Sequence, residues 1–457
     1  MATFHILNFG CRASQADGAA LKQQLLQAGL QEVASVEESA VAILNTCTVT
    51  ASADAEVRQF VRRIHRRNPQ CRILVTGCYA QRAPEEIARL EGVAWVVGNS
   101  HKHLVGSILA PPSSKDTVDG RGHTGRGATD GGSPLVGPDA PQVLVGEITE
   151  EFHFAPVFAD DRTRPTLKIQ DGCDARCSFC VIPSVRGQSR SLAPEKVLEQ
   201  VRHLEEAGYQ EVVLSGINLG GYGRDLDRRI NFLGLVERIL GETSIARIRI
   251  SSIEPMDAGP ALIRLVAEEP RMAQHFHVPL QSGCDRILRL MNRRYWTKQY
   301  AERLLAIQEQ IPNAAMGADV MVGFPGETDQ DHAASLRFIE SLPYTYLHIF
   351  PFSARPGTPA STAAGQVNGR VARERSQEIR AVITAKRQAF LAAQVGRSLP
   401  ALTLDEVEDG ARVALTTNYL KVALPSCEVP SNRLVNVSIG RVTSGQLVGY
   451  VEVSSRH

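Results

Sequence analysis

Three cysteines stand close together near the middle of the chain, at Cys173, Cys177 and Cys180. Three residues separate the first two and two residues separate the last two, so one short loop can bring all three thiolates to a common point. A 4Fe–4S cluster takes one ligand at each iron, so three cysteines hold it and leave one iron open. The alternatives are a zinc site and buried reduced thiols. Zinc sites usually pair two such units, and the neighbouring sequence contains no second unit.

An iron that is left open has a specific use in enzymes. The amino and carboxylate groups of S-adenosylmethionine can chelate it, and an electron from the cluster then breaks the sulfonium to give a 5′-deoxyadenosyl radical. This radical abstracts hydrogen from unactivated C–H bonds. The cofactors perform the difficult chemistry, and the protein supplies position and exclusion of water. The cysteine loop therefore predicts radical chemistry.

Three more cysteines, Cys11, Cys47 and Cys78, are far apart in sequence, but each follows the end of a predicted strand by one to three residues. These strands are Phe4–Asn8, Val41–Asn45 and Arg72–Gly77. Parallel sheets bind ligands at the carboxyl ends of their strands, so the three thiolates are expected to form a second three-ligand site; the alternative is three unrelated loop cysteines. Cys71 begins a strand roughly 20 Å from Cys78, at about 3.3 Å per residue, and is expected to be structural.

Strands and helices alternate over residues 1–109, which predicts an N-terminal α/β domain with a parallel sheet. Its helices are expected near residues 17–28 and 53–68, and a fourth strand at Trp95–Val97. Residues 110–158 are expected to be a linker or insertion. Gly, Pro, Ser and Asp dominate residues 110–141, and apolar residues are few there.

A strand–helix pattern repeats six times over residues 159–394. The strands are expected at Thr166–Gln170, Glu211–Ser215, Ala246–Ser251, His275–Leu280, Met316–Val322 and Tyr344–Phe350. The helices are expected near residues 195–207, 231–240, 259–268, 285–311, 329–341 and 370–394. Six β/α units predict a partial TIM-like (β/α)6 barrel, whose active face lies at the carboxyl ends of its strands. The cysteine loop follows the first strand and is expected on that face.

The loops after the other strands carry glycines and polar residues, which let backbone and hydrogen-bonding groups approach a ligand. Ordinary βα loops favour the same residue types, so a single loop does not identify a site. Together with the cysteine loop, they predict the contacts with S-adenosylmethionine, which are Phe179, Ser215, Gly216, Ser252, Glu254 and Gln281. His275 and His277 share one face of their strand and are expected to line the barrel rather than to bind metal.

The helical pattern stops near Gly396, and five short strand patterns over residues 395–457 predict a small C-terminal β domain. The strands are expected at Leu399–Val407, Arg412–Thr416, Leu420–Leu424, Leu434–Val442 and Leu447–Val453. Asn418, Tyr419 and Lys421 place an aromatic ring and a cation near one turn, an arrangement that holds single-stranded nucleic acid on small barrels. A capping domain with an ordinary turn is the alternative.

Composition limits the classes to which the protein can belong. Its 457 residues are enough for two or three domains, and 43% hydrophobic content is ordinary for a globular protein. A formal net charge of +1 argues against general electrostatic binding of nucleic acid but is compatible with a structured RNA met by local basic patches. No apolar run reaches the ~18 residues of a membrane helix. Nine cysteines without a secretory pattern indicate a reducing cytoplasm.

Several stretches together resemble one family over almost the whole chain, the radical S-adenosylmethionine methylthiotransferases. The stretches are Asn45–Cys47, Val75–Gln81, the Cys173–Cys180 loop with Ile182-Pro183 and Arg186–Ser191, Pro279–Gly283 and Val322–Thr328. The resemblance implies an N-terminal cluster domain, a central radical domain and a C-terminal TRAM-type barrel.

The resemblance also implies cofactors and a mechanism. Two 4Fe–4S clusters are expected: a radical-generating one on Cys173, Cys177 and Cys180, and an auxiliary one on Cys11, Cys47 and Cys78. One S-adenosylmethionine methylates a sulfur species at the auxiliary cluster, and a second gives the radical that removes hydrogen from carbon 2 of an adenine. A flavodoxin-like or ferredoxin-like electron donor, a cytoplasmic location and a monomeric state are expected too. Arg186 and Arg190, beside the radical cluster, are expected to meet RNA phosphate or solvent.

Within the family, Phe350–Ala360 and Asn418–Val422 resemble the branch that acts on threonylcarbamoyladenosine beside the anticodon of tRNA. Arg12 agrees with this branch, whereas Ala13-Ser14 stands where the branch usually has Val-Asn. The expected activity is methylthiolation of that base, with Asn418, Tyr419 and Lys421 on the RNA. The alternatives are the same chemistry on isopentenyladenosine in tRNA or on a ribosomal-protein aspartate, and an iron–sulfur protein that binds nucleic acid and senses redox state.

Overall fold

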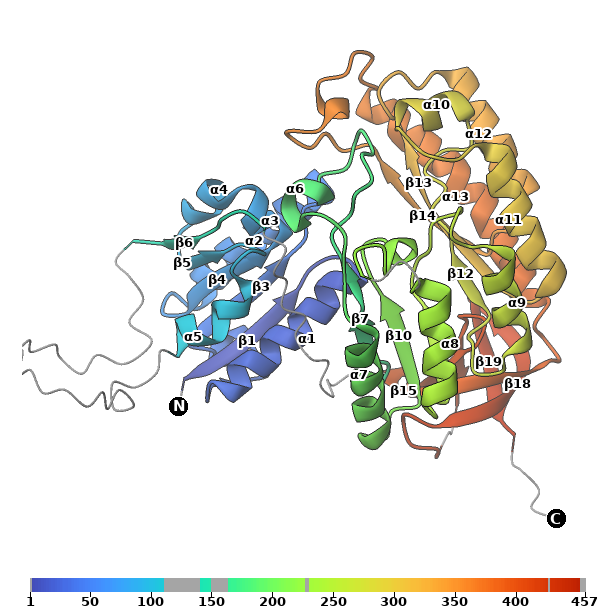
Figure 1. Cartoon of the computed structure of the whole chain (residues 1–457), viewed down its shortest axis with the longest axis horizontal. Coiled ribbons are helices and arrows are strands. Elements are labelled where there is room, and N and C mark those ends of the chain that lie inside the picture. The colour runs from blue at the N-terminus through green and yellow to red at the C-terminus, as the bar shows by residue number, and fades with distance from the viewer. Residues whose placement is uncertain (1, 111–139, 149–162, 227–229, 426–427, 453–457) are drawn as a thin grey trace, which may run out of the picture. The chain divides into compact units, whose positions relative to one another are not determined.

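The computed structural model describes residues 2–110, 140–148, 163–226, 230–425 and 428–452 (Figure 1). The chain divides into two units. The first comprises Met1–Phe158 and Ser184–Gly187, and the second comprises Ala159–Pro183 and Gln188–His457. Most of the linker predicted at residues 110–158 lies outside the described residues.

The first unit is built on a parallel sheet of six strands in the order β2-β1-β3-β4-β5-β6. The strands are β1 (Thr3–Asn8), β2 (Gln31–Glu32), β3 (Val41–Thr46), β4 (Arg72–Gly77), β5 (Val93–Val97) and β6 (Gln142–Leu144). Every residue of β3 and β5 is buried, as expected for parallel strands that have helices on both faces. The predicted α/β architecture is confirmed.

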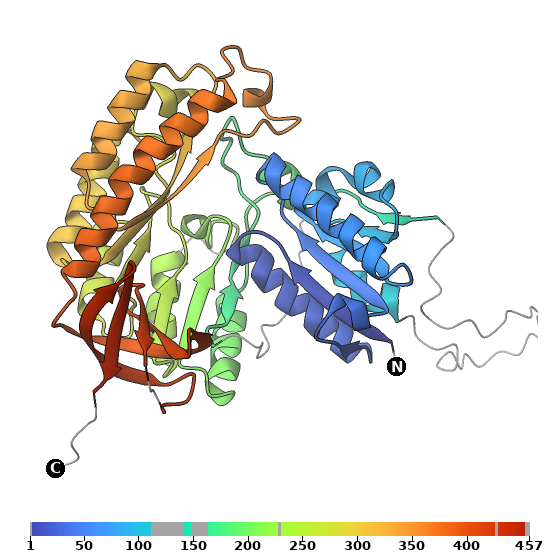
Figure 2. The same ribbon diagram turned by 180° about the vertical axis from the view of Figure 1, so that it is seen from behind.

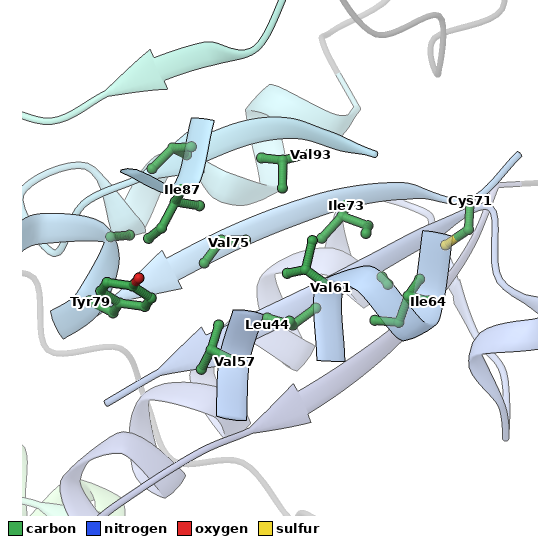
Figure 3. Close-up of a cluster of buried hydrophobic side chains, with 13 residues drawn as sticks. Leu44, Val57, Val61, Ile64, Cys71, Ile73, Val75, Tyr79, Ile87 and Val93 are labelled. Atoms are coloured by element: carbon green, nitrogen blue, oxygen red, sulfur yellow. The ribbon is translucent and has the colours of Figure 1, made fainter. Parts of the chain in front are cut away.

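Helices cover both faces of this sheet. They are α1 (Arg12–Gln27), α2 (Ala51–Arg67), α3 (Cys78–Arg82), α4 (Pro84–Ala88) and α5 (Val105–Leu109), with the 3-10 turns η1 (Val36–Glu38) and η2 (Lys102–Leu104). Val57, Val61 and Ile64 recur on α2 with a helical period and pack with Leu44 and Val75 of the sheet (Figure 3). Helices α1 and α5 pack on the alternate residues of β3 and β4, which face the other side.

Strand β6 lies inside the range predicted as a linker. It pairs in parallel with β5, from Trp95 opposite Gln142 to Val97 opposite Leu144, so it extends the sheet instead of leaving it. This part of the linker prediction is corrected. A strand of three residues at the sheet edge, mostly exposed, is too short to display the alternation by which strands are recognised in a sequence.

The second unit contains six parallel strands that alternate with helices, as predicted. Two three-stranded sheets have the orders β11-β10-β7 and β12-β13-β14. The strands are β7 (Thr166–Lys168), β10 (Glu211–Ser215), β11 (Arg247–Ile250), β12 (His275–His277), β13 (Ala315–Val322) and β14 (Tyr346–Pro351). The helices are α7 (Pro194–Glu206), α8 (Phe232–Glu242), α9 (Pro260–Glu268), α10 (Asp285–Leu290), α11 (Thr297–Gln310), α12 (Asp329–Ser341) and α13 (Gly369–Ala392). In the part of the chain that the structure describes, no helix is both long and apolar enough to cross a membrane.

One predicted helix is divided in two. A single helix is expected near residues 285–311, whereas α10 ends at Leu290 and α11 begins at Thr297. Asn292 adopts the left-handed conformation (φ 57°) and its amide donates to the carbonyl of Arg289 at 3.0 Å. The amide of Arg293 donates to the carbonyl of Leu288 at 2.9 Å. These two bonds form a Schellman motif, which ends a helix and accepts Asn in place of Gly. The prediction of one continuous helix is therefore wrong.

A closed five-stranded β-barrel follows α13, in the order β15-β16-β17-β19-β18. Its strands are β15 (Ser398–Glu408), β16 (Ala411–Thr416), β17 (Lys421–Leu424), β18 (Leu434–Thr443) and β19 (Gln446–Val451). Figure 2 shows this barrel in red, below the lower end of the long orange helix α13. The predicted small C-terminal barrel is confirmed.

Buried charges join this barrel to the strands of the same unit. Arg249 of β11 is fully buried, pairs with Glu211 of β10 at 2.8 Å, and donates to the carbonyl oxygens of Thr416 and Thr417 at 3.1 Å each. Burial alone would raise the pKa of Glu211, but the surrounding arginines, Arg249 first, lower it to about 2. The carboxylate therefore stays ionised and compensates the arginine charge inside the protein.

Candidate functional site

The three clustered cysteines lie at the carboxyl end of the first strand of the second unit. Their loop follows β7 and the short strand β8 (Gln170–Asp171), and all three cysteines line one cavity of about 440 Å³. Residues after other strands complete the lining, so the cavity lies on the face that carries active sites in barrels of this kind. Its volume is in the range of pockets that bind small molecules and cofactors.

Four of the six residues predicted to contact S-adenosylmethionine line this cavity: Phe179, Ser252, Glu254 and Gln281. Ser215 and Gly216 are not among the lining residues. Ser215 is buried at the end of β10, and the space beside Gly216 is taken by Gln170, whose Oε1 would lie 2.9 Å from a Cβ added to the glycine. The missing side chain at Gly216 thus permits packing of a protein neighbour, and contact of Ser215 and Gly216 with the cofactor stays a prediction.

Two buried acceptors in the cavity have no hydrogen-bond partner among the described residues, Oδ1 of Asn218 and Oε1 of Gln281. Gln281 also has a left-handed backbone, with φ 64°, a conformation that costs on the order of 1–3 kcal/mol. Backbone strain and unsatisfied buried acceptors both concentrate at ligand sites. The cavity therefore fits a ligand that presents hydrogen-bond donors, such as the ammonium group and ribose hydroxyls of S-adenosylmethionine.

Burial dominates the electrostatics of the cysteine loop. It raises the pKa of Cys173, and it raises the pKa of Cys180 to about 12 with a further contribution from Cys177. The amide of Ala175 donates to Sγ of Cys173 at 3.4 Å, and Nη1 of Arg293 donates to Sγ of Cys177 at 3.2 Å. Buried thiols of this kind release their protons when they bind metal. The loop therefore suits a cationic iron–sulfur cluster.

Asn218, Arg293 and Asp319 also line the cavity and were not predicted. Asp319 of β13 approaches His277 at 3.2 Å, and His277 contacts the hydroxyl of Tyr346 at 3.1 Å, so this histidine lines the barrel as expected. A weak signal for two of these residues is present in the sequence. Asn218 belongs to a predicted strand-end loop, and Arg293 follows an asparagine, a residue type that ends helices.

The first unit brings the ends of three strands together at one edge of its sheet. Strands β3 and β4 are paired through their last residues, so Cys47 and Cys78 leave the sheet at the same level. Gly10, with φ 103°, carries the chain from β1 against Cys47: a Cβ added to Gly10 would lie 2.4 Å from the Cβ of Cys47. Cys11 comes next and precedes α1. The three cysteines therefore share one edge, as their positions after strands suggest.

Electrostatics also links these cysteines. Burial, followed by the neighbouring Cys11 and Cys78, raises the pKa of the Cys47 thiol to about 12. Nε of Arg186 donates to Sγ of Cys78 at 3.2 Å, and its Nη2 pairs with Asp17 at 2.9 Å. Three thiolates at one place need more positive charge than one arginine that is already paired. A 4Fe–4S cluster fits this donor set, because metal binding replaces the thiol protons.

Among the described residues, no three Cys, His, Asp or Glu side chains lie close enough to surround a single metal ion. Thiolates that hold a 4Fe–4S cluster each bind a different iron and stand further apart.

Three of the residues predicted to contact RNA are buried: Arg186, Arg190 and Asn418. Asn418 is 1% exposed, accepts a hydrogen bond from Thr416 at 2.6 Å and donates to the carbonyl of Asn313 at 3.1 Å. Burial gives these three side chains no support as RNA contacts, and their contact with RNA stays a prediction. Sequence patterns around a turn do not reveal what packs over it.

Tyr419 and Lys421 line a second cavity of about 440 Å³, formed with parts of β14, α13 and the C-terminal barrel. Arg164, His348 and Arg387 line it too, and its described lining contains no carboxylate. Tyr419 stacks on His275 with 4.2 Å between ring centroids, and Lys421 pairs with Glu406 at 2.6 Å. The lining of this cavity therefore combines apolar side chains with basic ones.

Two family models cover the parts of the chain that carry the two sets of cysteines. Residues 3–98 match the model of uncharacterized protein family UPF0004, and residues 167–339 match that of the radical SAM superfamily. A threonylcarbamoyladenosine tRNA methylthiotransferase, MtaB, of Aquifex aeolicus is 36% identical over 90% of this chain and 94% of its own. A tRNA-2-methylthio-N(6)-dimethylallyladenosine synthase of Natranaerobius thermophilus is 30% identical over 98% and 96%.

A solved structure supports the fold alone. The radical S-adenosylmethionine methyltransferase TsrM from Kitasatospora setae superposes with a TM-score of 0.51 at 14% identity, over 79% of this chain and 74% of its own. A radical SAM domain implies a 4Fe–4S cluster and S-adenosylmethionine, which agrees with the cysteine loop and the unsatisfied acceptors beside it. With relatives matched over nearly their whole length, the chain belongs to the radical SAM methylthiotransferase family of transferases.

Proposed function

We propose that the protein adds a methylthio group to carbon 2 of threonylcarbamoyladenosine, next to the anticodon of tRNA. The observation that carries this proposal is the likeness, over nearly the full length, to a threonylcarbamoyladenosine tRNA methylthiotransferase. The stretches Phe350–Ala360 and Asn418–Val422 resemble the same branch.

Each set of cysteines has a separate role in this proposal. Cys173, Cys177 and Cys180 hold the radical-generating cluster, and Cys11, Cys47 and Cys78 hold an auxiliary 4Fe–4S cluster. When bound, these clusters and S-adenosylmethionine supply the radical, the sulfur and the methyl group. Asn218 and Gln281 accept hydrogen bonds from the cofactor, and Arg186 contributes positive charge beside Cys78.

The tRNA is proposed to contact the second cavity, because the exposed Arg387 adds a cation to a lining that already contains Tyr419 and Lys421, the aromatic ring and the cation predicted to contact RNA. Replacing Arg387 with alanine is expected to weaken tRNA binding and to lower the slope of log affinity against log salt by about 1. Filter binding at several salt concentrations measures both quantities. Arg373→Ala is the matched control, since Arg373 is an exposed arginine of α13 outside the cavity lining. Equal slopes in the two variants would contradict the assignment.

A second candidate is the same chemistry on a dimethylallyl-type adenosine. The observation that favours it is the similarity of the chain to the synthase of Natranaerobius thermophilus. The stretches Phe350–Ala360 and Asn418–Val422 speak against a ribosomal-protein aspartate as substrate. The cofactor-sized cavity at the cysteine loop speaks against redox sensing without turnover. An electron donor of the flavodoxin or ferredoxin type, a cytoplasmic location and a monomeric state complete the proposal.

One assay separates these functions. The protein is reconstituted with iron and sulfide without oxygen, reduced with dithionite, and given S-adenosylmethionine with tRNA that carries either threonylcarbamoyladenosine or isopentenyladenosine. Mass spectrometry of the digested nucleosides is expected to find the methylthio group on the first. Modification of the second tRNA alone would support the second candidate. Failure to cleave S-adenosylmethionine at all would favour the redox sensor.

A further inference from the structure

The break between helices α10 and α11 docks directly on the cysteine loop. The amide of Ser178 donates to the carbonyl of Met291 at 3.0 Å, and its hydroxyl donates to the carbonyl of Leu290 at 2.8 Å. Nδ2 of Asn292 donates to the carbonyl of Arg176 at 2.6 Å. Three hydrogen bonds thus tie the residues on both sides of Cys177, the second cysteine, to the end of α10.

A fourth contact reaches a cysteine sulfur. The side chain of Arg293 is 8% exposed, and its Nη1 donates to Sγ of Cys177 at 3.2 Å. The same guanidinium pairs with Glu254 and donates from Nε to the hydroxyl of Tyr295 at 3.2 Å. Arg293 therefore spans the cavity wall between a cysteine and a carboxylate that faces the ligand space.

The backbone explains why Arg293 points there. The Schellman motif turns the chain at Asn292, so the next side chain leaves the helix surface and enters the cavity. In a continuous helix over residues 285–311, the side chain of Arg293 would lie on the helix surface in line with its neighbours three and four residues away. The left-handed residue and the arginine thus act as one structural element.

We propose that Arg293 is a positioning residue of the radical cluster, which holds Cys177 and Glu254 in place through a helix break that is clamped to the cysteine loop. The inference deepens the proposed function and rests on the role given there to Cys177. Hydrogen bonds and charge next to a ligating sulfur tune a cluster's potential and its retention. A positive charge favours the reduced cluster, because reduction adds negative charge close to the guanidinium.

The test compares Arg293→Gln, Arg293→Lys and the control Arg289→Gln in the reconstituted full chain. Arg289 is an exposed arginine of α10 that lies over the ring of Trp296, outside the cavity lining. Three readouts are taken: release of iron to a chelator, the midpoint potential by redox titration with EPR detection, and the melting temperature. Because the auxiliary cluster also releases iron, the measurements use the background in which Cys11, Cys47 and Cys78 are alanine.

Arg293→Gln is expected to release iron about tenfold faster and to have a more negative midpoint potential. Replacing residues that hydrogen-bond to metal ligands typically weakens metal binding by about 10–100-fold. Arg293→Lys keeps the charge and is expected to restore the potential toward that of the parent. Arg289→Gln is expected to match the parent in all three readouts. If Arg293→Gln acted only by unfolding the protein, its melting temperature would fall and Arg293→Lys would not restore the midpoint potential.

Parent-like iron release and potential in Arg293→Gln would overturn the inference. So would a glutamine variant whose potential lysine does not restore. A parent protein that binds no iron at all would instead overturn the role proposed for Cys177, so the two failures are distinguishable.

Discussion

Replacing Cys11, Cys47 and Cys78 together with alanine is expected to halve the iron content, from about eight irons per chain to about four. The expectation follows from two sets of three cysteines, each gathered at the carboxyl edge of its own strands. Cleavage of S-adenosylmethionine under dithionite is expected to continue, because Cys173, Cys177 and Cys180 are intact. Methylthiolation is expected to fall below detection. Iron and sulfide analysis, with nucleoside mass spectrometry, measures each effect.

Cys71→Ala is the matched control for this experiment. Cys71 is 1% exposed and packs in the core between the sheet and α2 (Figure 3). Its Sγ lies 3.5 Å from the hydroxyl of Ser39. Its loss is expected to reduce stability by about 1 kcal/mol and to leave about eight irons. About four irons in both the parent and the triple variant would contradict the auxiliary cluster, and with it the proposed methylthiolation.

The strand pattern was sufficient to predict this edge of the sheet. Strands such as Val41–Thr46 end one to three residues before each cysteine, and parallel strands fix which ends share an edge. The strand pattern therefore predicts that cysteines far apart in the sequence lie at the same edge of the sheet. The same reasoning predicted the six β/α units and the five strands of the C-terminal barrel, where local patterns and global fold agree.

The details that escaped prediction depend on contacts between elements. Arg293 enters its cavity because one left-handed asparagine ends a helix inside a stretch whose apolar spacing is helical throughout. Asn418 is buried because the carbonyl of Asn313 packs over its turn, and no local pattern indicates that neighbour. Glu211 and Arg249 lie within fully buried strands, and their pairing becomes evident only when β10 and β11 are adjacent.

Replacing Glu211 with glutamine is expected to destabilise the second unit by about 3–5 kcal/mol, the usual effect of removing one partner of a buried ion pair. Arg249 would keep its hydrogen bonds to the carbonyl oxygens of Thr416 and Thr417 but would lose the carboxylate that neutralises it. Urea unfolding followed by the fluorescence of Trp296, in a Trp95→Phe background, reports on this unit. Glu195→Gln removes an exposed pair with Arg238 and is expected to change the stability far less, because solvent screens exposed pairs.

The same carboxylate is expected to make the stability of this unit depend on acid pH. The folded-state pKa of Glu211 is lowered to about 2, whereas the unfolded chain has a value of about 4.3. The ion pair therefore contributes its full stability above about pH 4.3, and this contribution is lost as the pH falls toward 2. Glu211→Gln is expected to flatten that part of the profile, while Glu195→Gln keeps it. The free energy of unfolding could instead fall in parallel for the parent and Glu211→Gln between these pH values. That result would show that the charge of Glu211 does not stabilise the buried arginines. Hydrogen bonds and packing alone would then attach the C-terminal barrel to β11.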